Sequence, residues 1–231
     1  MYTLYIANRN YSSWSLRPWV LLTERGIPFE EKLMPFQGGT SSSLSAFRAF
    51  SPTGKVPCLH DGDTVVWDSL SIAEYIAERH PGAWPADARA RARAWARSAA
   101  AEMHSGFDAL RSHCPMNCGI RLQRHSVPPA LSRDLARVQE LWNEGLQRFG
   151  GPYLAGEDFT AVDAFYAPVV FRIQSYRLAV DDIAQAYVQR MLALPSMRRW
   201  YDEALKETWR DTDHEQETLC QGALLEDLRS A

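Results

Sequence analysis

The sequence predicts two domains of different class: a small mixed α/β domain over residues 1–82, then an all-helical domain over residues 83–231. In the first domain, β-rich runs alternate with helical patterns, which predicts a sheet with helices packed on it. The residues after Pro85 keep a helical spacing of apolar side chains, with no strand alternation. Between the two lies "GAWPADA", residues 82–88, whose glycine and proline are typical of a linker.

The elements of the first domain follow from apolar spacing and turn residues. Apolar residues at helical spacing in 16–25 end at Gly26, a typical helix stop. The Asp-Gly dipeptide at 61–62 joins two β-like runs and predicts a hairpin turn. The expected elements are strands at 3–8 and 27–36, helices at 16–25, 41–50 and 69–82, and a hairpin at 55–68. Their order, β-α-β-α-β-β-α, predicts a small mixed sheet rather than a doubly wound one.

The second domain is expected to contain helices alone. An alanine-rich pattern predicts one long helix over 87–113, and a second helix is expected over about 130–148. "DFTAVDAFYAPVVFRIQSY", residues 158–176, predicts a buried third helix, in which "TAVD" has the spacing of a capping box. Two more helices are divided by Pro195. The residues after about 206 are polar and weakly periodic, and we expect them to form a tail.

The composition is that of a globular protein, with 46% hydrophobic and 23% charged residues. The net charge of −3 gives no reason to expect nucleic acid or an anionic membrane as a partner. No apolar run approaches the roughly 18–20 residues that span a bilayer. The N-terminus lacks the basic start and the long apolar stretch of a signal peptide, so we expect a cytoplasmic protein.

The four cysteines are expected to be free thiols in a chain of this length and compartment: Cys58, Cys114, Cys118 and Cys220. Two of them lie with two histidines in "HCPMNCGIRLQRH", residues 113–125. This spacing fits no zinc pattern, so we interpret the segment as a helix end and a turn, and expect no metal.

A turn rich in hydroxyl groups precedes the first helix. "NYSSWSLRPW", residues 10–19, contains Tyr11, Ser12, Ser13 and Ser15. Because the first turn of a helix tolerates a proline ring, Pro18 favours Trp14 or Ser15 as the N-cap. Free N–H groups and the positive end of the helix dipole would then point at the serines and stabilise an anion there. The alternative is that the serines only cap the helix and form the turn.

Two later segments carry further polar groups. Val56-Pro57 lies at a strand start, where proline is unusual unless its peptide bond is cis, and a cis bond would turn the backbone of Val56 outward. Asp68 and Ser69 begin the next helix, where Ser69 alone could be a simple cap. In the functional interpretation, free N–H groups there hold a substrate carboxylate and Asp68 holds a substrate ammonium.

Four motifs in register, over residues 2 to about 205, resemble the cytosolic glutathione transferase family: "YSSWSLRPW", "TGKVPCL", "WDSLSIAEYIAE" and "GEDFTAVDAFYAPVV". The resemblance implies a thioredoxin-like N-terminal domain and a helical domain that forms the pocket for a small electrophile. It also implies glutathione as co-substrate, a homodimer, and a role in detoxification. The serine run is similar to that of the serine-type members, particularly the zeta class, with Trp14 where the zeta pattern has cysteine.

The resemblance assigns roles to single residues. Ser12 matches the serine that hydrogen-bonds the glutathione sulfur, with Ser13 as its close rival and Tyr11 as a further alternative. The residues matched to the rest of glutathione are Val56 beside Pro57 for the cysteinyl backbone, Asp68 and Ser69 for the γ-glutamyl end, and Lys55 and Gln37 for the glycyl carboxylate. Trp14, Met103, His104 and Phe107 are the candidate walls of the electrophile pocket, although the two mid-helix residues among them also suit simple packing.

The function expected from these residues is transfer of glutathione to a small electrophile by a stabilised thiolate. A glutathione-dependent isomerase of the maleylacetoacetate type, a peroxidase, and a non-catalytic binding module are the alternatives. For the dimer, a basic stripe of Arg89, Arg93 and Arg97 is expected to face Glu74 and Glu78 of the partner, the alternative being two separate solvated faces.

Overall fold

The computed structural model describes residues 1–38, 40–86 and 89–229 of the chain. Its first elements are β1 (Tyr2–Ile6), α1 (Ser13–Glu24), β2 (Phe29–Leu33), α2 (Thr40–Phe47), β3 (Cys58–Asp61), β4 (Thr64–Trp67) and α3 (Ser69–Ala77). This order confirms the predicted pattern. The four strands form one mixed sheet in the order β2-β1-β3-β4, in which β1 runs parallel to β2 and antiparallel to β3.

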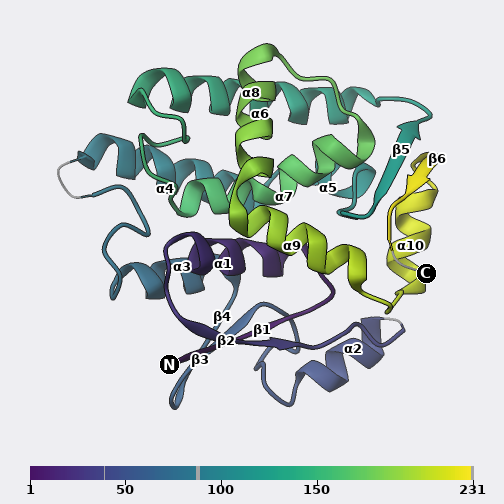
Figure 1. Cartoon of the computed structure of the whole chain (residues 1–231), viewed down its shortest axis with the longest axis horizontal. Coiled ribbons are helices and arrows are strands. Elements are labelled where there is room, and N and C mark those ends of the chain that lie inside the picture. Colours follow the sequence, from purple (N-terminus) through teal and green to yellow (C-terminus); the bar gives the residue numbers. More distant parts are fainter. Residues whose placement is uncertain (39, 87–88, 230–231) are drawn as a thin grey trace.

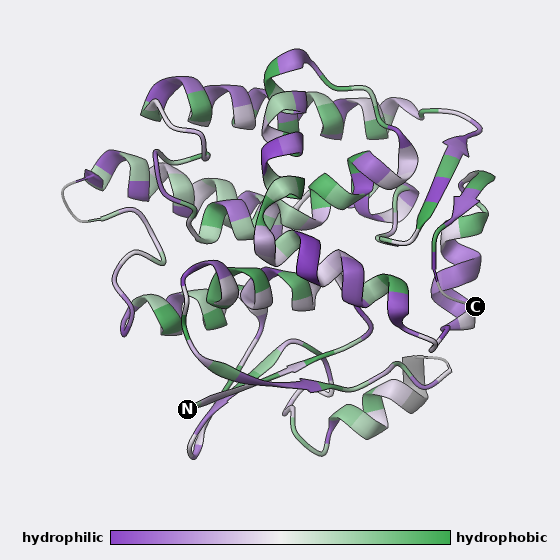
Figure 2. Ribbon diagram, viewed as in Figure 1, coloured by the Kyte–Doolittle hydropathy of each residue, from purple (hydrophilic) through white to green (hydrophobic). Residues whose placement is uncertain are grey.

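The sheet lies below α1 and α3 in Figure 1, and the later helices lie above them. Alternate residues of β1, Tyr2, Leu4 and Ile6, are buried, as expected for a strand with one face toward the core. Figure 2 shows apolar residues along α1 and α3, between the sheet and the upper helices, whereas α9 (Pro195–Lys206) carries a hydrophilic outer surface. Because α1 packs against α7 (Ala161–Tyr176) and α9, the N-terminal end of α1 lies where the two halves of the chain meet.

The first helix begins earlier than the proline predicts. Its N-cap is Ser12, so Pro18 lies in the helix interior rather than in the first turn. An interior proline leaves the carbonyl one turn back, that of Trp14, without its helical hydrogen bond. This loss is offset because α1 buries Leu16, Trp19, Val20, Leu21 and Leu22 almost completely.

The hairpin turn is also displaced by one residue. Asp61 pairs with Thr64, so the two-residue loop is Gly62-Asp63 instead of Asp61-Gly62. Gly62 has a φ of +57°, which the tight turn requires and which glycine adopts without steric cost.

The remaining elements are α4 (Ala90–Ser105), α5 (Asp108–His113), β5 (Ile120–Arg124), α6 (Pro129–Phe149), α7, α8 (Asp182–Ala193), α9, α10 (Thr212–Leu219) and β6 (Gly222–Asp227). Pro195 begins α9, which confirms the predicted division between the last two long helices. Part of the expected linker, residues 87–88, lies outside the described residues. Over the described ranges, no helix is both long enough and apolar enough to cross a bilayer.

The expected long helix over 87–113 is two helices. Gly106 is extended and Phe107 is left-handed, with a φ of +61°, so the chain changes direction between α4 and α5. Glycine is a poor helix former and a common stop. The carbonyl of Gly106, freed by the break, accepts a hydrogen bond of 3.0 Å from Arg111 Nε. The break therefore fixes the direction of the Arg111 side chain.

The second half of the chain is not wholly helical, and its end is not a loose tail. β5 and β6 pair antiparallel, with a register shift at Arg121/Leu122. α10 and β6 belong to the segment after residue 206. Because most residues of β6 are exposed, this polar segment lacks the apolar alternation that would predict a strand. In Figure 1 this segment runs down the right-hand edge of the molecule, beside β5 and above α2.

The buried helix α7 confirms the predicted capping box. Asp163 Oδ2 accepts from the N–H of Thr160 at 3.0 Å, and Asp163 Oδ1 accepts from the N–H of Leu154 at 2.9 Å. Tyr187 adds a third hydrogen bond, from its hydroxyl to Asp163 Oδ1, at 3.0 Å. The box therefore joins α7 to the loop before it and to α8.

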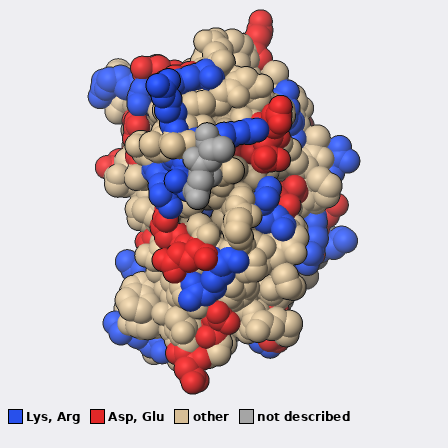
Figure 3. Space-filling view, turned by 90° about the vertical axis from the view of Figure 1, so that its left-hand side faces the viewer, with Lys and Arg blue, Asp and Glu red and all other residues tan. Residues whose placement is uncertain are grey.

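Two arginines of the basic stripe at α4 form ion pairs within the same chain. Arg97 Nη2 lies 3.1 Å from Glu74 Oε2 on α3, and Arg89 Nη2 lies 3.6 Å from Glu157. Glu78 pairs with its neighbour Arg79. Figure 3 shows basic and acidic side chains interspersed on this side of the molecule, rather than one large patch of a single sign.

Candidate active site

A cavity of about 640 Å³ opens at the N-terminal end of α1. Its walls come from the α1 turn, α2, the loop before β3, the α5–β5 region, α7 and α10. The residues that line it are Tyr11, Ser12, Ser13, Trp14, Phe36, Ser43, Leu44, Phe47, Gly54, Lys55, Val56, Arg111, Pro115, Met116, Arg172, Asp211, Asp213, His214 and Glu217. Both halves of the chain therefore contribute to a single cavity.

Ser12 and Ser13 are 5% and 6% exposed and face this cavity from the first turn of α1. Ser12 is the N-cap, but its side chain makes no capping hydrogen bond. Its hydroxyl instead lies 2.7 Å from Ser15 Oγ, which accepts a hydrogen bond from the N–H of Ala7 at 3.2 Å. Ser13 Oγ makes no hydrogen bond within the described part of the chain. The two serines thus bring hydroxyl groups and a helix N-terminus to one wall.

Tyr11 has a different partner. Its hydroxyl donates to Glu215 Oε1 at 2.6 Å, and its ring stacks on His214 at a centroid distance of 5.1 Å. Burial first, and then the hydrogen bond to Glu215, raise the pKa of Tyr11. The Tyr11 proton is therefore engaged away from the serine turn.

The Val56-Pro57 peptide bond is cis, as the sequence predicts. Val56 and Lys55 line the cavity, while Pro57 is buried outside its walls. Gln37 is exposed and its side chain does not reach the cavity. The Gln37 N–H donates to Ser43 Oγ at 2.9 Å, and Ser43 is the residue of this pair that lines the wall.

Asp68 and Ser69 do not line the cavity. Asp68, with a φ of +75°, is the N-cap of α3, and its Oδ1 accepts from the Leu70 N–H at 2.8 Å. Ser69 is 1% exposed, and its Oγ accepts from Arg17 Nη1 at 3.3 Å. The structure thus gives the capping role to Asp68 rather than to Ser69.

The three helical-domain residues expected to wall the electrophile pocket lie behind it. Met103 is fully buried in the core, and Phe107 is the left-handed residue between α4 and α5. His104 packs edge-on against Trp14 at 5.2 Å between ring centroids, and its Nε2 lies 3.4 Å from Asp68 Oδ2. Burial, the largest cause, lowers the pKa of His104 against the opposing effect of Asp68. Only Trp14 of the four expected pocket residues lines the cavity.

In the helical half of the chain, the cavity-lining residues that the sequence did not predict lie in two regions. Arg111, Pro115 and Met116 lie at and after α5, and Arg172 lies on α7. Arg172 did carry a signal, because it is a single cation within the apolar run "FYAPVVFRI". Four more wall residues belong to the segment expected to be a tail: Asp211, Asp213, His214 and Glu217.

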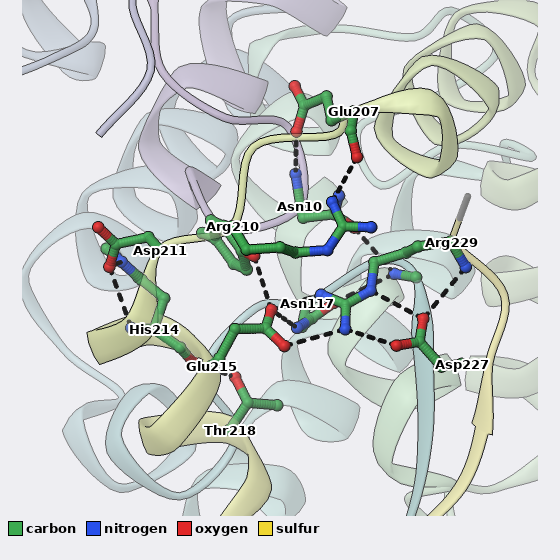
Figure 4. Close-up of polar contacts among 12 residues, drawn as sticks. Asn10, Asn117, Glu207, Arg210, Asp211, His214, Glu215, Thr218, Asp227 and Arg229 are labelled. Atoms are coloured by element: carbon green, nitrogen blue, oxygen red, sulfur yellow. Dashed lines mark hydrogen bonds and ion pairs between the residues drawn. The ribbon is translucent and has the colours of Figure 1, made fainter. Parts of the chain in front are cut away.

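Buried polar contacts hold residues 207–229, which we name the C-terminal strap, against the rest of the chain (Figure 4). Glu207 Oε1 accepts from the Arg9 N–H at 2.8 Å. Glu215 lies at the centre, since it accepts from Tyr11, from Asn117 Nδ2 at 3.3 Å and from Arg229 Nη2 at 2.9 Å. Because α10 forms part of the cavity wall, these contacts fix one side of the site.

Within the described ranges, no group of three or more His, Cys, Asp or Glu side chains is placed to hold a metal ion. The cysteines Cys58, Cys114 and Cys118 are buried free thiols, and Cys220 is an exposed one. Burial raises the pKa of Cys58 and of Cys114 to about 11. None of the four cysteines lines the cavity, so the cavity has no protein thiol to act as a nucleophile.

Family models identify the chain. Residues 11–79 match the N-terminal domain of glutathione S-transferases, and residues 86–203 match their C-terminal domain. The chain belongs to the glutathione S-transferase family, whose thioredoxin-like and helical architecture it shares.

Individual relatives agree with this assignment. Glutathione S-transferase 3 of Zea mays is 29% identical over 163 residues, which cover 66% of this chain and 70% of the relative. A dichloromethane dehalogenase of Methylorubrum extorquens is 37% identical over 60 residues, but the match spans 26% of this chain and only 21% of that protein. A solved glutathione transferase homologue from Burkholderia, with bound glutathione, has a TM-score of 0.62 at 23% identity, covering 88% of this chain and 97% of that one.

Proposed function

We propose that this protein binds glutathione in the cavity at α1, ionises its thiol, and transfers it to a small electrophile. The observation that carries the proposal is the placement of two serine hydroxyls at the α1 N-terminus, in the same cavity as Lys55 and Val56. Glutathione suits such a cavity, because the serine turn offers donors to its thiolate and Lys55 offers a cation to its glycyl carboxylate.

The proposed contacts follow the chain of glutathione. The backbone of Val56 pairs with the cysteinyl residue beside the cis-Pro57, and Lys55 meets the glycyl carboxylate. Gln37 is the weaker candidate for this carboxylate, since its side chain lies away from the cavity wall. Asp68 and Ser69 receive the γ-glutamyl end at the start of α3, which requires the ligand to extend beyond the present cavity walls.

The energetics of thiol ionisation are within reach of this arrangement. Lowering a thiol pKa by two units needs about 2.7 kcal/mol of preferential stabilisation of the anion. A hydrogen bond from Ser12 or Ser13 to a charged sulfur contributes about 1.5–3 kcal/mol, and a helix N-terminus up to about 1 kcal/mol. No general base is required, because the anion is stabilised directly and held beside its electrophile.

The alternatives use the same bound glutathione. An isomerase or a peroxidase would share the thiolate but differ in the second substrate. A binding module without catalysis would bind glutathione and fail to ionise it. We also propose a boundary between domains at residues 82 and 83, a cytoplasmic location, and a homodimer. The family models, which meet between residues 79 and 86, support the boundary, and the buried free thiols are consistent with the location.

Titration calorimetry with glutathione, followed by ultraviolet absorbance of the bound thiolate against pH, tests this proposal. We expect binding in the micromolar to millimolar range and a thiol pKa at least one unit below that of free glutathione. Turnover is then measured with a panel of aryl halides, epoxides, hydroperoxides and cis-alkene acids. Binding with an unshifted thiol pKa would favour the non-catalytic module, and absence of binding would overturn the proposal.

A further inference from the structure

We infer that the helical wall of this cavity binds an anionic group on the second substrate, so that the preferred electrophile is an apolar molecule carrying a carboxylate or a similar anion. The inference rests on the proposed function for the position of glutathione. Two cavity residues carry it: Arg111 from α5 and Arg172 from α7.

Three guanidinium groups lie near one another in this region, two of them against Trp14. Arg17 and Arg111 lie over the Trp14 ring, with their Cζ atoms 4.1 Å and 4.8 Å from its centroid. Arg172 is close enough to repel both other cations. Burial, and then the charge of Arg111, lower the pKa of Arg172 to about 10. Such a cluster of like charges, removed from water, is unfavourable unless an anion joins it.

Among the described residues, no acid lies at ion-pair distance from these guanidinium groups, and Asp68 and Asp108 act on Arg17 and Arg111 only as more distant charges. Within the described part of the chain, none of these three arginines forms a salt bridge. Their hydrogen bonds go to neutral acceptors: Ser69 Oγ for Arg17, the carbonyls of Met103 and Gly106 for Arg111, and the carbonyl of Cys114 for Arg172.

Arg172 is the critical residue of the cluster. It is 3% exposed, it lines the cavity, and its Nη1 has no hydrogen-bond partner among the described residues. Only Nε is bonded, at 2.8 Å to the Cys114 carbonyl, which fixes the plane of the guanidinium. A planar, fixed guanidinium with unused donors matches the two oxygens of a carboxylate.

The other walls define the rest of the ligand. Trp14, Pro115 and Met116 offer apolar surface beside the two arginines, and Ser12 lies in the same cavity. The acids of the strap do not neutralise this wall, because Asp213 and Glu217 are exposed at the α10 side and Asp211 pairs with His214 at 2.7 Å. Lys55 lies on the other domain, where the proposed function uses it for the glycyl carboxylate. The cavity therefore separates one cation for glutathione from two for its partner.

The test compares conjugates that differ only in charge. S-(4-carboxybenzyl)glutathione and S-(3-carboxybenzyl)glutathione are titrated calorimetrically against the corresponding carboxamides, which have nearly the same shape without the negative charge. We expect the wild-type protein to bind at least one carboxylate ten- to a hundredfold more tightly than its carboxamide. Equal affinity for both carboxylates and their carboxamides in the wild-type protein would overturn the inference without any variant.

Variants then locate the effect. Arg172→Met and Arg111→Met should each reduce the preference for carboxylate at least fivefold, and leave the affinity for S-methylglutathione within about twofold. Arg190→Met, which changes a half-buried arginine on α8 that hydrogen-bonds the Pro152 carbonyl, is the matched control and should keep the full preference. Thermal unfolding shows whether Arg172→Met is folded. If it is not, Arg111→Met alone tests whether the arginines cause the preference for carboxylate.

The outcomes separate this inference from the proposed function. If S-methylglutathione binds and the variants lower its affinity rather than the carboxylate preference, the arginines serve glutathione itself and the inference is wrong. If no glutathione derivative binds the wild-type protein, the proposed function falls, and the inference falls with it.

Discussion

Among single residues, the serines of the α1 turn are those to which the proposed function assigns the thiolate. In the structure Ser12 Oγ donates to Ser15 Oγ at 2.7 Å, and rotation of the two hydroxyls would reverse this bond when an anion accepts from Ser12. If Ser15 donates to Ser12, the Ser12 proton is free to meet a sulfur anion. We therefore expect Ser12→Ala to raise the pKa of bound glutathione by about one to two units, the equivalent of one charged hydrogen bond.

Ser15→Ala should produce a smaller rise of the same sign, because Ser12 loses the partner that orients it. Ser13→Ala is the matched control, since it removes a hydroxyl from the same wall and leaves this pair intact. Thiolate absorbance against pH measures all three variants. A rise in Ser13→Ala alone would assign the hydrogen bond to the sulfur to Ser13 and contradict the role expected here for Ser12.

Lys55 gives a second test at this scale. We expect Lys55→Met to weaken glutathione binding about three- to tenfold, because a partly exposed contact between a cation and a carboxylate is worth about 1 kcal/mol. The glycyl ethyl ester of glutathione lacks that carboxylate, so Lys55→Met should leave its affinity unchanged. An equal loss for glutathione and the ester would show that Lys55 does not meet the glycyl end. Gln37→Ala should change neither affinity.

Residues differ in how far the sequence can place them. The cis-Pro57 and the serine turn were predictable, because proline geometry and helix termini act within a few residues of the chain. Arg111 was not, because its direction depends on the break at Gly106 and Phe107. Neither was the exclusion of Met103 from the cavity, since burial in the core depends on packing between α4 and α7. Features set by neighbouring residues can therefore be predicted from the sequence, whereas the identity of the cavity-lining residues depends on contacts between distant segments.

At the scale of elements, the start of α7 joins three parts of the helical half. Asp163 accepts from two buried backbone N–H groups and from the Tyr187 hydroxyl, so Asp163→Ala would leave three buried donors unpaired. Each such donor costs about 1–3 kcal/mol, and we expect a loss of at least about 3 kcal/mol in the free energy of unfolding. Urea unfolding measures it. Asp181→Ala, a cap of the same chemistry at the less buried start of α8, should cost only about 1 kcal/mol.

Glu215 is the central carboxylate of the C-terminal strap. Although burial raises the pKa of Glu215, the hydrogen bonds from Arg229 and Tyr11 outweigh it and lower that pKa below its usual 4.5. A depressed carboxyl pKa contributes stability above the unfolded value, and this stability is lost as the pH falls through the folded value. We therefore expect the amides of β6 to lose exchange protection below about pH 4.5, before the β1–β3 sheet does.

Glu215→Gln should reduce this pH dependence, of which Asp227 keeps a part because Arg229 also lowers its pKa. It should also lower the protection of β6 at neutral pH by about 1–3 kcal/mol, because Arg229 keeps only Asp227 as its ionic partner. Hydrogen exchange, corrected for intrinsic rates, provides both measurements. Glu226→Gln, which alters an exposed acid on the same strand, is the control. Unchanged protection in Glu215→Gln would show that apolar contacts alone hold the strap. The sequence could not reveal this element, since its strand exposes most of its residues and its anchors lie on Tyr11 and Asn117.

At the scale of the whole molecule, the two halves were predictable because apolar residues recur at a different spacing in each. β1, α1 and the hairpin follow local patterns, and the apolar stripe of α6 is unmistakable over 21 residues. The β5–β6 sheet was not, because it pairs segments about a hundred residues apart, and neither strand alternates clearly enough to stand out alone. The cavity also belongs to this scale, since its walls come from both halves of the chain and from the strap.

The proposed homodimer can no longer rest on the stripes of α3 and α4. Arg97 and Glu74 pair within one chain, and both side chains are more than 40% exposed, so the pair should contribute less than about 1 kcal/mol to the packing of α3 on α4. We therefore expect a dimer at micromolar concentration whose dissociation constant changes less than twofold in Glu74→Arg. A double-mutant cycle of Arg97→Ala and Glu74→Ala should give a coupling energy below about 1 kcal/mol in unfolding experiments.

Sedimentation equilibrium measures the dissociation constant of the dimer, and Glu140→Arg on α6 is a control of equal charge change. A dimer that Glu74→Arg disrupts, with Glu140→Arg intact, would restore the interface between stripes. If the wild-type protein and both variants are monomers, the proposed homodimer is wrong, and the cavity forms within one chain without a partner.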